Sequence, residues 1–449
     1  MRPSLLLPLL LLAAIGLWAG LRGGGADDAA EQTARDPGLS RETVGGATNS
    51  DPAPAPTPDD PLRERALREN AAGLRALEAG DPRAAAAAFE RALEALPEDG
   101  TLARNLSRAR LEVGAVAYRA GRMGDAESWF TEARAAHPDD GAPAWWLARL
   151  LLQQGRRSEA AAVLDDALAR FPGSAPLLRL RADLAWLAGD LETALRDLEA
   201  ALQQEPDDAT LTARIRQLEE EQRAYGSFLT DATVHFDCRY DPADTRLVEA
   251  MPSLRQDVEA AYDAVVAALG IQPEQRLLVL FLDPERYGGS APAWSSGLYD
   301  GRVRVLVRDP ETQREALRAT LRHELTHAVL FTLGTGIPTW LHEGLAQQLE
   351  GSDPARARAR LRASGVRLEA AALGQDWTGW SDPGRVAEAY AYALAFAAWL
   401  PERFGPSAVS NLLHVLPGRG FDEAWRVAFA RPWAEVEAEH RAALLDGSG

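Results

Sequence analysis

The sequence predicts a chain of two folded parts, an array of helical hairpins followed by an α+β domain. A five-position pattern that returns about every 34 residues indicates the hairpins, and strand-like alternation that begins after Tyr225 and gives way to helices indicates the second part. With 449 residues, 46% of them hydrophobic and 25% charged, the chain is long enough for more than one hydrophobic core.

Residues 1–25 carry an apolar run preceded by Arg2 and followed by small residues, which is typical of an export signal. The length of the run lies between that of a cleaved signal peptide and that of a short membrane anchor. We therefore expect an exported protein, periplasmic or otherwise extracytoplasmic, that stays attached to the membrane if the segment is retained. Residues 26–61 are acidic and rich in Pro and Ala, a composition that predicts a disordered linker.

Residues 62–225 contain the repeats. Each of four units begins with a small residue, Gly or Ala, which is followed by an alanine, a large apolar residue, another alanine and a proline. The units are Gly73, Ala85, Phe89, Ala92, Pro97; Gly114, Ala126, Phe130, Ala133, Pro138; Ala148, Ala160, Leu164, Ala167, Pro172; and Ala182, Ala194, Leu198, Ala201, Pro206. Small residues let two helices approach closely, and proline ends the second helix.

This pattern resembles the tetratricopeptide repeat, a 34-residue helix hairpin. The resemblance implies an all-α solenoid with a concave groove for a protein partner, closed by an amphipathic helix through Leu211, Ile215 and Leu218. Three tryptophans, Trp145, Trp146 and Trp186, line the groove in one interpretation and belong to the core in the other.

Residues 226–449 begin with strand patterns at 232–240, 276–283 and 301–308, with a helix at 252–269 between the first two. Alternating Arg and Val from Arg302 to Val305 predict a strand with one solvated face at the sheet edge. From residue 309 onward the chain reads as helical, so this part is expected to be an α+β domain.

Charge and cysteine content exclude two classes of function. The net charge of −18, with a pI of about 5.0, repels phosphate backbones, so no nucleic-acid partner is expected. The single cysteine, Cys238, excludes an intramolecular disulfide and a cysteine-based zinc cluster, and its sequence context favours a half-buried thiol on a strand.

A His-Glu-x-x-His pattern stands in the helix expected from 309 to 333. His323 and His327 are four residues apart, so both imidazoles lie on one helix face where they can bind the same zinc ion. Glu324 is adjacent but offset, a position from which a carboxylate can reach a zinc-activated water without being a ligand. A second helix, expected to begin at Pro338, carries Glu343, which supplies the third ligand that a catalytic zinc site needs.

Together the two helices resemble those of the gluzincin superfamily of zinc metallopeptidases, and residues 340–346 are particularly similar to the glutamate helix of its aminopeptidase N branch. The resemblance implies a zincin-like fold for 226–449, a Zn²⁺ ion on His323, His327 and Glu343, and Glu324 as general base. It also implies that an extended peptide substrate pairs with the edge strand near Val303 to Val307. His342 occupies a position that is usually asparagine in that branch, and no Gly-Ala-Met-Glu-Asn segment is present, so aminopeptidase specificity is not implied.

Three other residues near the motif have two interpretations each. Tyr390 is assigned to oxyanion stabilisation, with Tyr392 beside it as a rival, although both also fit core positions. Glu350, two turns after Glu343, either orients a ligand imidazole or is a solvated helix end. His342 is expected to be solvated or to contact substrate.

The sequence thus predicts an exported zinc metallopeptidase that hydrolyses peptides or proteins and uses its repeats to bind substrate or a partner protein. The alternative is a catalytically inactive repeat scaffold with a residual zinc-binding domain. An intact Glu324, which a scaffold does not need, favours the enzyme.

Overall fold

The computed structural model describes residues 60–446, apart from 288–296, 300, 335, 367, 369, 374–376, 378–379 and 381. The expected export segment and nearly all of the expected linker therefore lie outside the described residues. No helix in the described part is both long enough and apolar enough to span a membrane.

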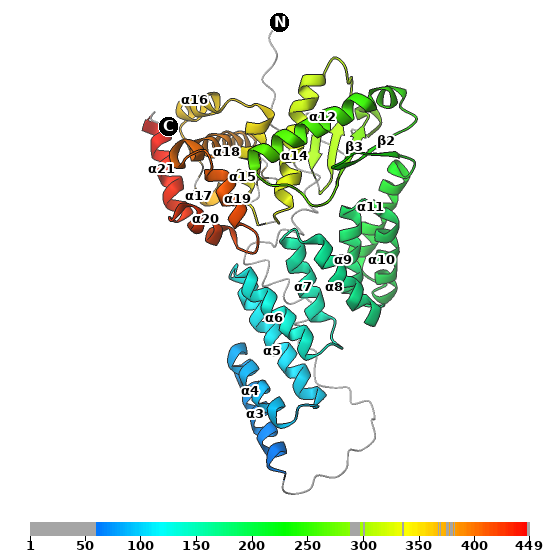
Figure 1. Ribbon diagram of the computed structural model, residues 1–449, viewed down its shortest axis with the longest axis vertical. Coiled ribbons are helices and arrows are strands. Elements are labelled where there is room, and N and C mark those ends of the chain that lie inside the picture. Colours follow the sequence, from blue (N-terminus) through cyan, green and yellow to red (C-terminus); the bar gives the residue numbers. More distant parts are fainter. Residues whose placement is uncertain are drawn as a thin grey trace.

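The first folded part is an array of four helical hairpins, as predicted, and it curves away from the rest of the molecule (Figure 1). The hairpins pair α3 (Pro61–Glu78) with α4 (Pro82–Ala95), α5 (Gly100–Arg119) with α6 (Met123–Ala136), α7 (Ala142–Gln153) with α8 (Arg157–Arg170), and α9 (Ala175–Leu187) with α10 (Leu191–Gln204). Helix α11 (Ala209–Tyr225) closes the array and buries Leu211, Ile215 and Leu218.

Each hairpin is held by a small residue on its first helix that faces a large one on its second. A Cβ atom on Gly73 would lie 2.5 Å from the ring of Phe89, and one on Gly114 would lie 2.5 Å from the ring of Phe130. The third and fourth hairpins carry alanine and leucine at these two positions. The first residue is larger and the second is smaller than in the Gly–Phe pairs, so the combined side-chain volume stays similar, as close packing requires.

The three tryptophans with two interpretations belong mainly to the core. Trp146 and Trp186 retain only 5% and 3% of their exposure, whereas Trp145 is half-buried and packs edge-to-face on Trp146.

The second part contains a sheet with the strand order β1-β2-β3-β5-β4 within the described residues. Its strands are β1 (Leu229–Ala232), β2 (Phe236–Tyr240), β3 (Leu277–Leu282), β4 (Gly297–Tyr299) and β5 (Val303–Leu306). Strands β2, β3 and β5 are parallel, and β1 and β4 are antiparallel edges. Cys238 is fully buried on β2, where burial raises the pKa of its thiol to about 12.

Two expectations about the strands are wrong. The strand predicted at 232–240 covers only Phe236–Tyr240, because the backbone turns between Thr233 and Phe236, and the antiparallel β1 ends at Ala232. Strand β5 is internal, since β4 pairs with it on one side and β3 on the other. An extended peptide therefore cannot pair with β5, and the prediction of a wet edge strand fails.

Two arginines, Arg302 just before β5 and Arg304 within it, are covered by the repeats and not by water. Arg302 is buried, forms an ion pair with Glu221 of α11, and lies 4.3 Å from the ring centre of Trp186 on α9. Arg304 pairs with the same carboxylate at 3.2 Å. A buried charge is stable only when it is paired, so α9, α11 and β5 form a fixed interface between the two parts.

Helices make up the rest of the second part (Figure 1). They are α12 (Thr245–Leu269), α13 (Pro284–Tyr287), α14 (Arg314–Phe331), α15 (Thr339–Glu350), α16 (Pro354–Ser364), α17 (Ala370–Leu373), α18 (Pro383–Phe404), α19 (Ala408–Val415), α20 (Phe421–Phe429) and α21 (Trp433–Asp446). Helix α12 begins before the predicted residue 252, because Asp244 caps its first turn and Pro252 is accommodated inside it.

An aromatic and polar core joins the last helix to α18. Tyr392 is fully buried and donates a hydrogen bond to Glu437 on α21 at 2.7 Å, and His440 stacks on Phe396 at 4.9 Å between ring centres. Burial, together with the charges of Arg358 and Arg441, lowers the pKa of His440 to about 3. This histidine is therefore neutral and structural at ordinary pH.

Candidate metal centre

Helix α14 carries the histidine motif, and ion pairs hold its amino end in place. It begins at Arg314, five residues after the predicted start, because Asp309 forms a turn with its own downstream amides. Near its amino end, Arg314 and Arg318 bond the buried Asp257 of α12 at 2.8–3.0 Å. The apolar face of the helix is packed into the core of the second part.

The two motif histidines direct the same ring atoms toward each other. Nε2 of His323 and Nε2 of His327 are 3.2 Å apart, as expected for residues one helical turn apart on one face. Their side chains keep 19% and 13% of their exposure, so both are largely buried but still reach solvent.

Helix α15 brings Glu343 to the same point. One carboxylate oxygen lies 3.8 Å from Nε2 of His323, and the other lies 3.8 Å from Nε2 of His327. One ligand atom from each of the three residues lies within 4.8 Å of the other two. In the part of the chain that the structure describes, this is the group of His, Cys, Asp and Glu that can hold a metal ion.

The separations fit a zinc ion. Zn–N and Zn–O bonds of about 2.0–2.2 Å place the ligand atoms of a tetrahedral site roughly 3.4 Å apart. The observed 3.2 and 3.8 Å bracket that value. Two imidazoles and one carboxylate also leave one coordination position open, as in catalytic sites.

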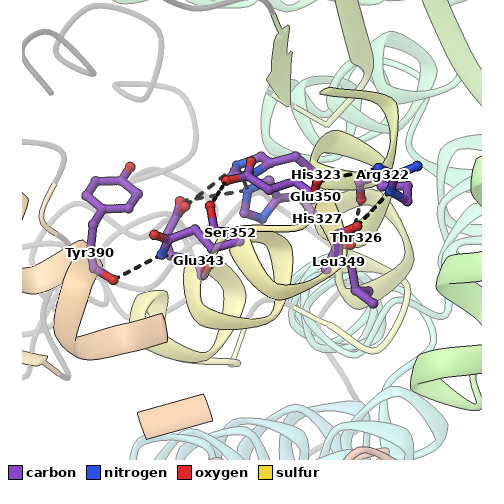
Figure 2. Close-up of polar contacts among 10 residues, drawn as sticks. Arg322, His323, Thr326, His327, Glu343, Leu349, Glu350, Ser352 and Tyr390 are labelled. Carbon is purple, nitrogen blue, oxygen red and sulfur yellow. Dashed lines mark hydrogen bonds and ion pairs between the residues drawn. The ribbon is translucent and has the colours of Figure 1, made fainter. Parts of the chain in front are cut away.

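Glu350, at the end of α15, orients His323. Its Oε2 atom lies 2.7 Å from Nδ1 of His323, and Ser352 donates a hydrogen bond to its other oxygen at 2.5 Å (Figure 2). Of the two interpretations of this glutamate, the structure therefore favours the orienting one over a solvated helix end. A carboxylate on the far nitrogen of a ligand imidazole fixes its tautomer and raises its basicity.

These contacts set the charge of His323. Burial disfavours its charged form, but the hydrogen bond to Glu350 and the negative charges of Glu324 and Glu343 outweigh it and raise the pKa of His323 to about 9. Burial acts against the ionised form of Glu350 as well, and the contact with His323 lowers its pKa. Binding of a metal at His323 Nε2 therefore has to displace a proton.

His342 is buried, so the expectation that it is solvated is wrong. It is 2% exposed, and its Nδ1 atom lies 3.5 Å from Nδ1 of His327. Its position next to Glu343 suggested exposure, but α15 packs against both α14 and α18 and so buries more than one face.

The helices that carry the ligands are braced by polar and backbone contacts. Arg322 donates hydrogen bonds to the carbonyl oxygens of Leu349 and Glu350, joining α14 to the end of α15 (Figure 2). On the other side of α15, a Cβ atom on Gly344 would lie 2.4 Å from the carbonyl oxygen of Ala393 on α18. Gly344 thus permits a close helix approach that no other residue allows.

The remaining catalytic candidates lie near this centre. Glu324 follows His323 on α14 and is 7% exposed. Tyr390 is half-buried on α18, its carbonyl accepts a hydrogen bond from Gln347 of α15 at 3.1 Å, and Figure 2 draws it on the Glu343 side of the cluster. Its rival Tyr392 is buried and donates its hydroxyl proton to Glu437 in the core.

Comparison with known proteins concerns the repeats. Family models of the tetratricopeptide repeat match residues 70–141 and 117–184, which confirms these repeats in the first part of the chain. Among solved structures, a thermophilic tetratricopeptide-repeat protein from Thermus thermophilus is 21% identical to this chain. The match covers 34% of this chain and 99% of that protein, with a TM-score of 0.22. No curated protein matches the chain.

Proposed function

We propose that this protein is a gluzincin-type zinc metallopeptidase that is exported and that uses its tetratricopeptide repeats to bind a substrate or a partner protein. The observation that carries the proposal is the convergence of His323, His327 and Glu343 from two helices at separations suited to zinc. Export rests on the apolar segment within residues 1–25.

Each residue has one task in this proposal. His323, His327 and Glu343 would hold the zinc ion, which when bound would supply Lewis-acid chemistry to polarise the scissile carbonyl and to activate a water molecule. Glu324, fixed beside His323, accepts a proton on its carboxylate and delivers it to the nitrogen of the leaving amine. Tyr390 donates a hydrogen bond from its hydroxyl to the oxygen that gains negative charge in the transition state. Glu350 and His342 keep the ligand imidazoles in place.

A second candidate function is a catalytically inactive scaffold. The observation that favours it is that the repeats, which generally mediate protein–protein interaction, are the part of the chain with matches among known families. In this alternative the metal binds but only stabilises the second part.

The test combines metal content with peptide digestion. The chain, purified without chelator, is expected to hold about one zinc per molecule, and His323→Ala and Glu343→Ala are expected to lose it, as measured by plasma mass spectrometry. Glu324→Gln should keep the zinc and lose cleavage of a peptide library, because it removes the base and no ligand. Cleavage weakened by Tyr390→Phe with zinc retained would support the oxyanion role.

The outcomes separate the two candidates. Zinc binding without cleavage of any peptide by the unaltered chain would favour the scaffold. Absence of zinc even after metal is added back would overturn the metal centre and the peptidase together.

A further inference from the structure

The turns inside the four hairpins share one backbone conformation but differ in their surroundings. Gly80, Gly121, Gly155 and Gly189 occupy this turn in successive hairpins, with φ between +71° and +76°. A Cβ atom on Gly80 would meet nothing within 4 Å among the described residues, whereas one on Gly155 would lie 2.0 Å from the carbonyl oxygen of Thr332. The third turn is therefore pressed against the segment that follows α14.

The contact at the third turn is made by the main chain on both sides. Gly334, with φ of +110°, would place a Cβ atom 2.1 Å from the carbonyl oxygen of Gln153, the last residue of α7. Backbone atoms cannot yield as the end of a flexible side chain can. The end of α14 and the α7–α8 turn thus fix each other's position.

The side chain that continues the row of metal ligands enters the repeats. His323, His327 and Phe331 are each four residues apart on α14, so they lie along one helix face. Phe331 is 3% exposed and belongs to the hydrophobic core of the repeats, with the guanidinium of Arg157 lying 5.1 Å from its ring centre. The helix face that presents zinc ligands at one end is thus anchored in the repeats at the other.

We propose that the third hairpin is a positioning element of the metal centre. The contacts of Arg314 and Arg318 with Asp257 hold the amino end of α14. The α7–α8 turn and the buried Phe331 hold its carboxyl end. The position of His327 relative to Glu343 therefore depends on contacts at both ends of the helix. The inference rests on the proposed zinc site. It assigns the repeats a role in the metal centre itself, in addition to recruitment of a partner.

Reciprocal coupling gives a test that needs no mutation. If the third hairpin favours the zinc-binding arrangement, zinc must stabilise the third hairpin by the same free energy. Hydrogen exchange of the full-length chain, with and without Zn²⁺, should show added protection at residues 153–157 and 331–334 and none at the first turn, 78–82. Protection confined to α14 and α15 would overturn the proposal.

A matched pair of glycine variants tests the same coupling from the other side. Gly155→Ala and Gly80→Ala introduce the same side chain at nearly the same φ, so they carry the same backbone strain. Only the side chain of Gly155→Ala meets the segment that follows α14. In chelator competition, the zinc affinity of Gly155→Ala should fall about tenfold, while Gly80→Ala should keep the affinity of the unaltered chain. The absorption spectrum of bound Co²⁺ should shift only in Gly155→Ala.

A second pair replaces the first if Gly155→Ala does not fold, as judged by its circular dichroism. Phe331→Leu on α14 and Phe89→Leu on α4 each shorten a phenylalanine that is buried in the hydrophobic cores of the repeats, and only Phe331→Leu should weaken zinc binding. Equal affinity within either pair overturns the positioning role while the zinc site stands. Failure of the unaltered chain to bind zinc overturns the proposed function and this inference with it.

Discussion

The repeats and the C-terminal part are both built mainly from helices, but their closest contacts differ in kind. In the first hairpin, Gly73 faces the ring of Phe89, a side chain that can be exchanged for a smaller one. In the C-terminal part, Gly344 faces the carbonyl oxygen of Ala393, which every residue type carries. The difference teaches that the repeats can compensate a change within one hairpin, whereas the metal-binding helices cannot.

Gly344→Ala should have the largest effect. Because its Cβ would lie 2.4 Å from a backbone oxygen, α15 must move away from α18, and we expect a loss of about 3 kcal/mol or more in unfolding free energy together with loss of zinc. Urea denaturation and metal analysis measure both. Gly336→Ala, whose Cβ would meet none of the described residues within 4 Å, is the control. If Gly344→Ala behaves like this control, the claimed rigidity of the helix contact is wrong.

Gly73→Ala should cost about 2 kcal/mol in unfolding free energy, because its Cβ would overlap the Phe89 ring. The double variant Gly73→Ala with Phe89→Leu reproduces the pair found in the third and fourth hairpins, so it should recover most of that loss. A double-mutant cycle in urea measures the coupling. Purely additive losses would contradict the idea that hairpins compensate internally.

Acid should destabilise the C-terminal part through His440. Its pKa of about 3 in the folded protein lies below the unfolded value of about 6.5, so the unfolded chain binds the extra proton. This contribution to the unfolding free energy is fully present above pH 6.5 and is lost as the pH falls toward 3. At pH 5 the protein has lost about 2 kcal/mol of it. Unfolding midpoints of the unaltered chain and of His440→Gln at pH 8 and pH 5 isolate it. A pH slope that is the same in both proteins would exclude His440 as its source.

The two motif histidines give the finest comparison, since His323 contacts a carboxylate and His327 contacts an imidazole. Glu350→Gln removes a charged partner at 2.7 Å from His323 and should weaken zinc binding about tenfold or more. His342→Asn keeps an acceptor near His327, whose partner atom is 3.5 Å away, and should change the affinity less. Chelator competition ranks the two, and a larger loss in His342→Asn would reverse the assignment.

Much of this organisation was predictable because it is encoded locally. The spacing of Gly73, Gly114, Ala148 and Ala182 predicted four hairpins, since the period reports which face of each helix is buried. The four-residue spacing of His323 and His327 predicted that they share a helix face for the same reason.

What the sequence by itself determined is therefore the kind of each element and the residue types that it presents: hairpins, a small sheet, and two helices that carry His323, His327 and Glu343. Tertiary structure alone decided that β5 is internal, that His342 is buried beside His327, that Glu350 bonds His323, and that Phe331 enters the repeats. The physical reason is that periodicity records whether a face is covered, whereas the identity of the covering element depends on contacts between residues far apart in the chain.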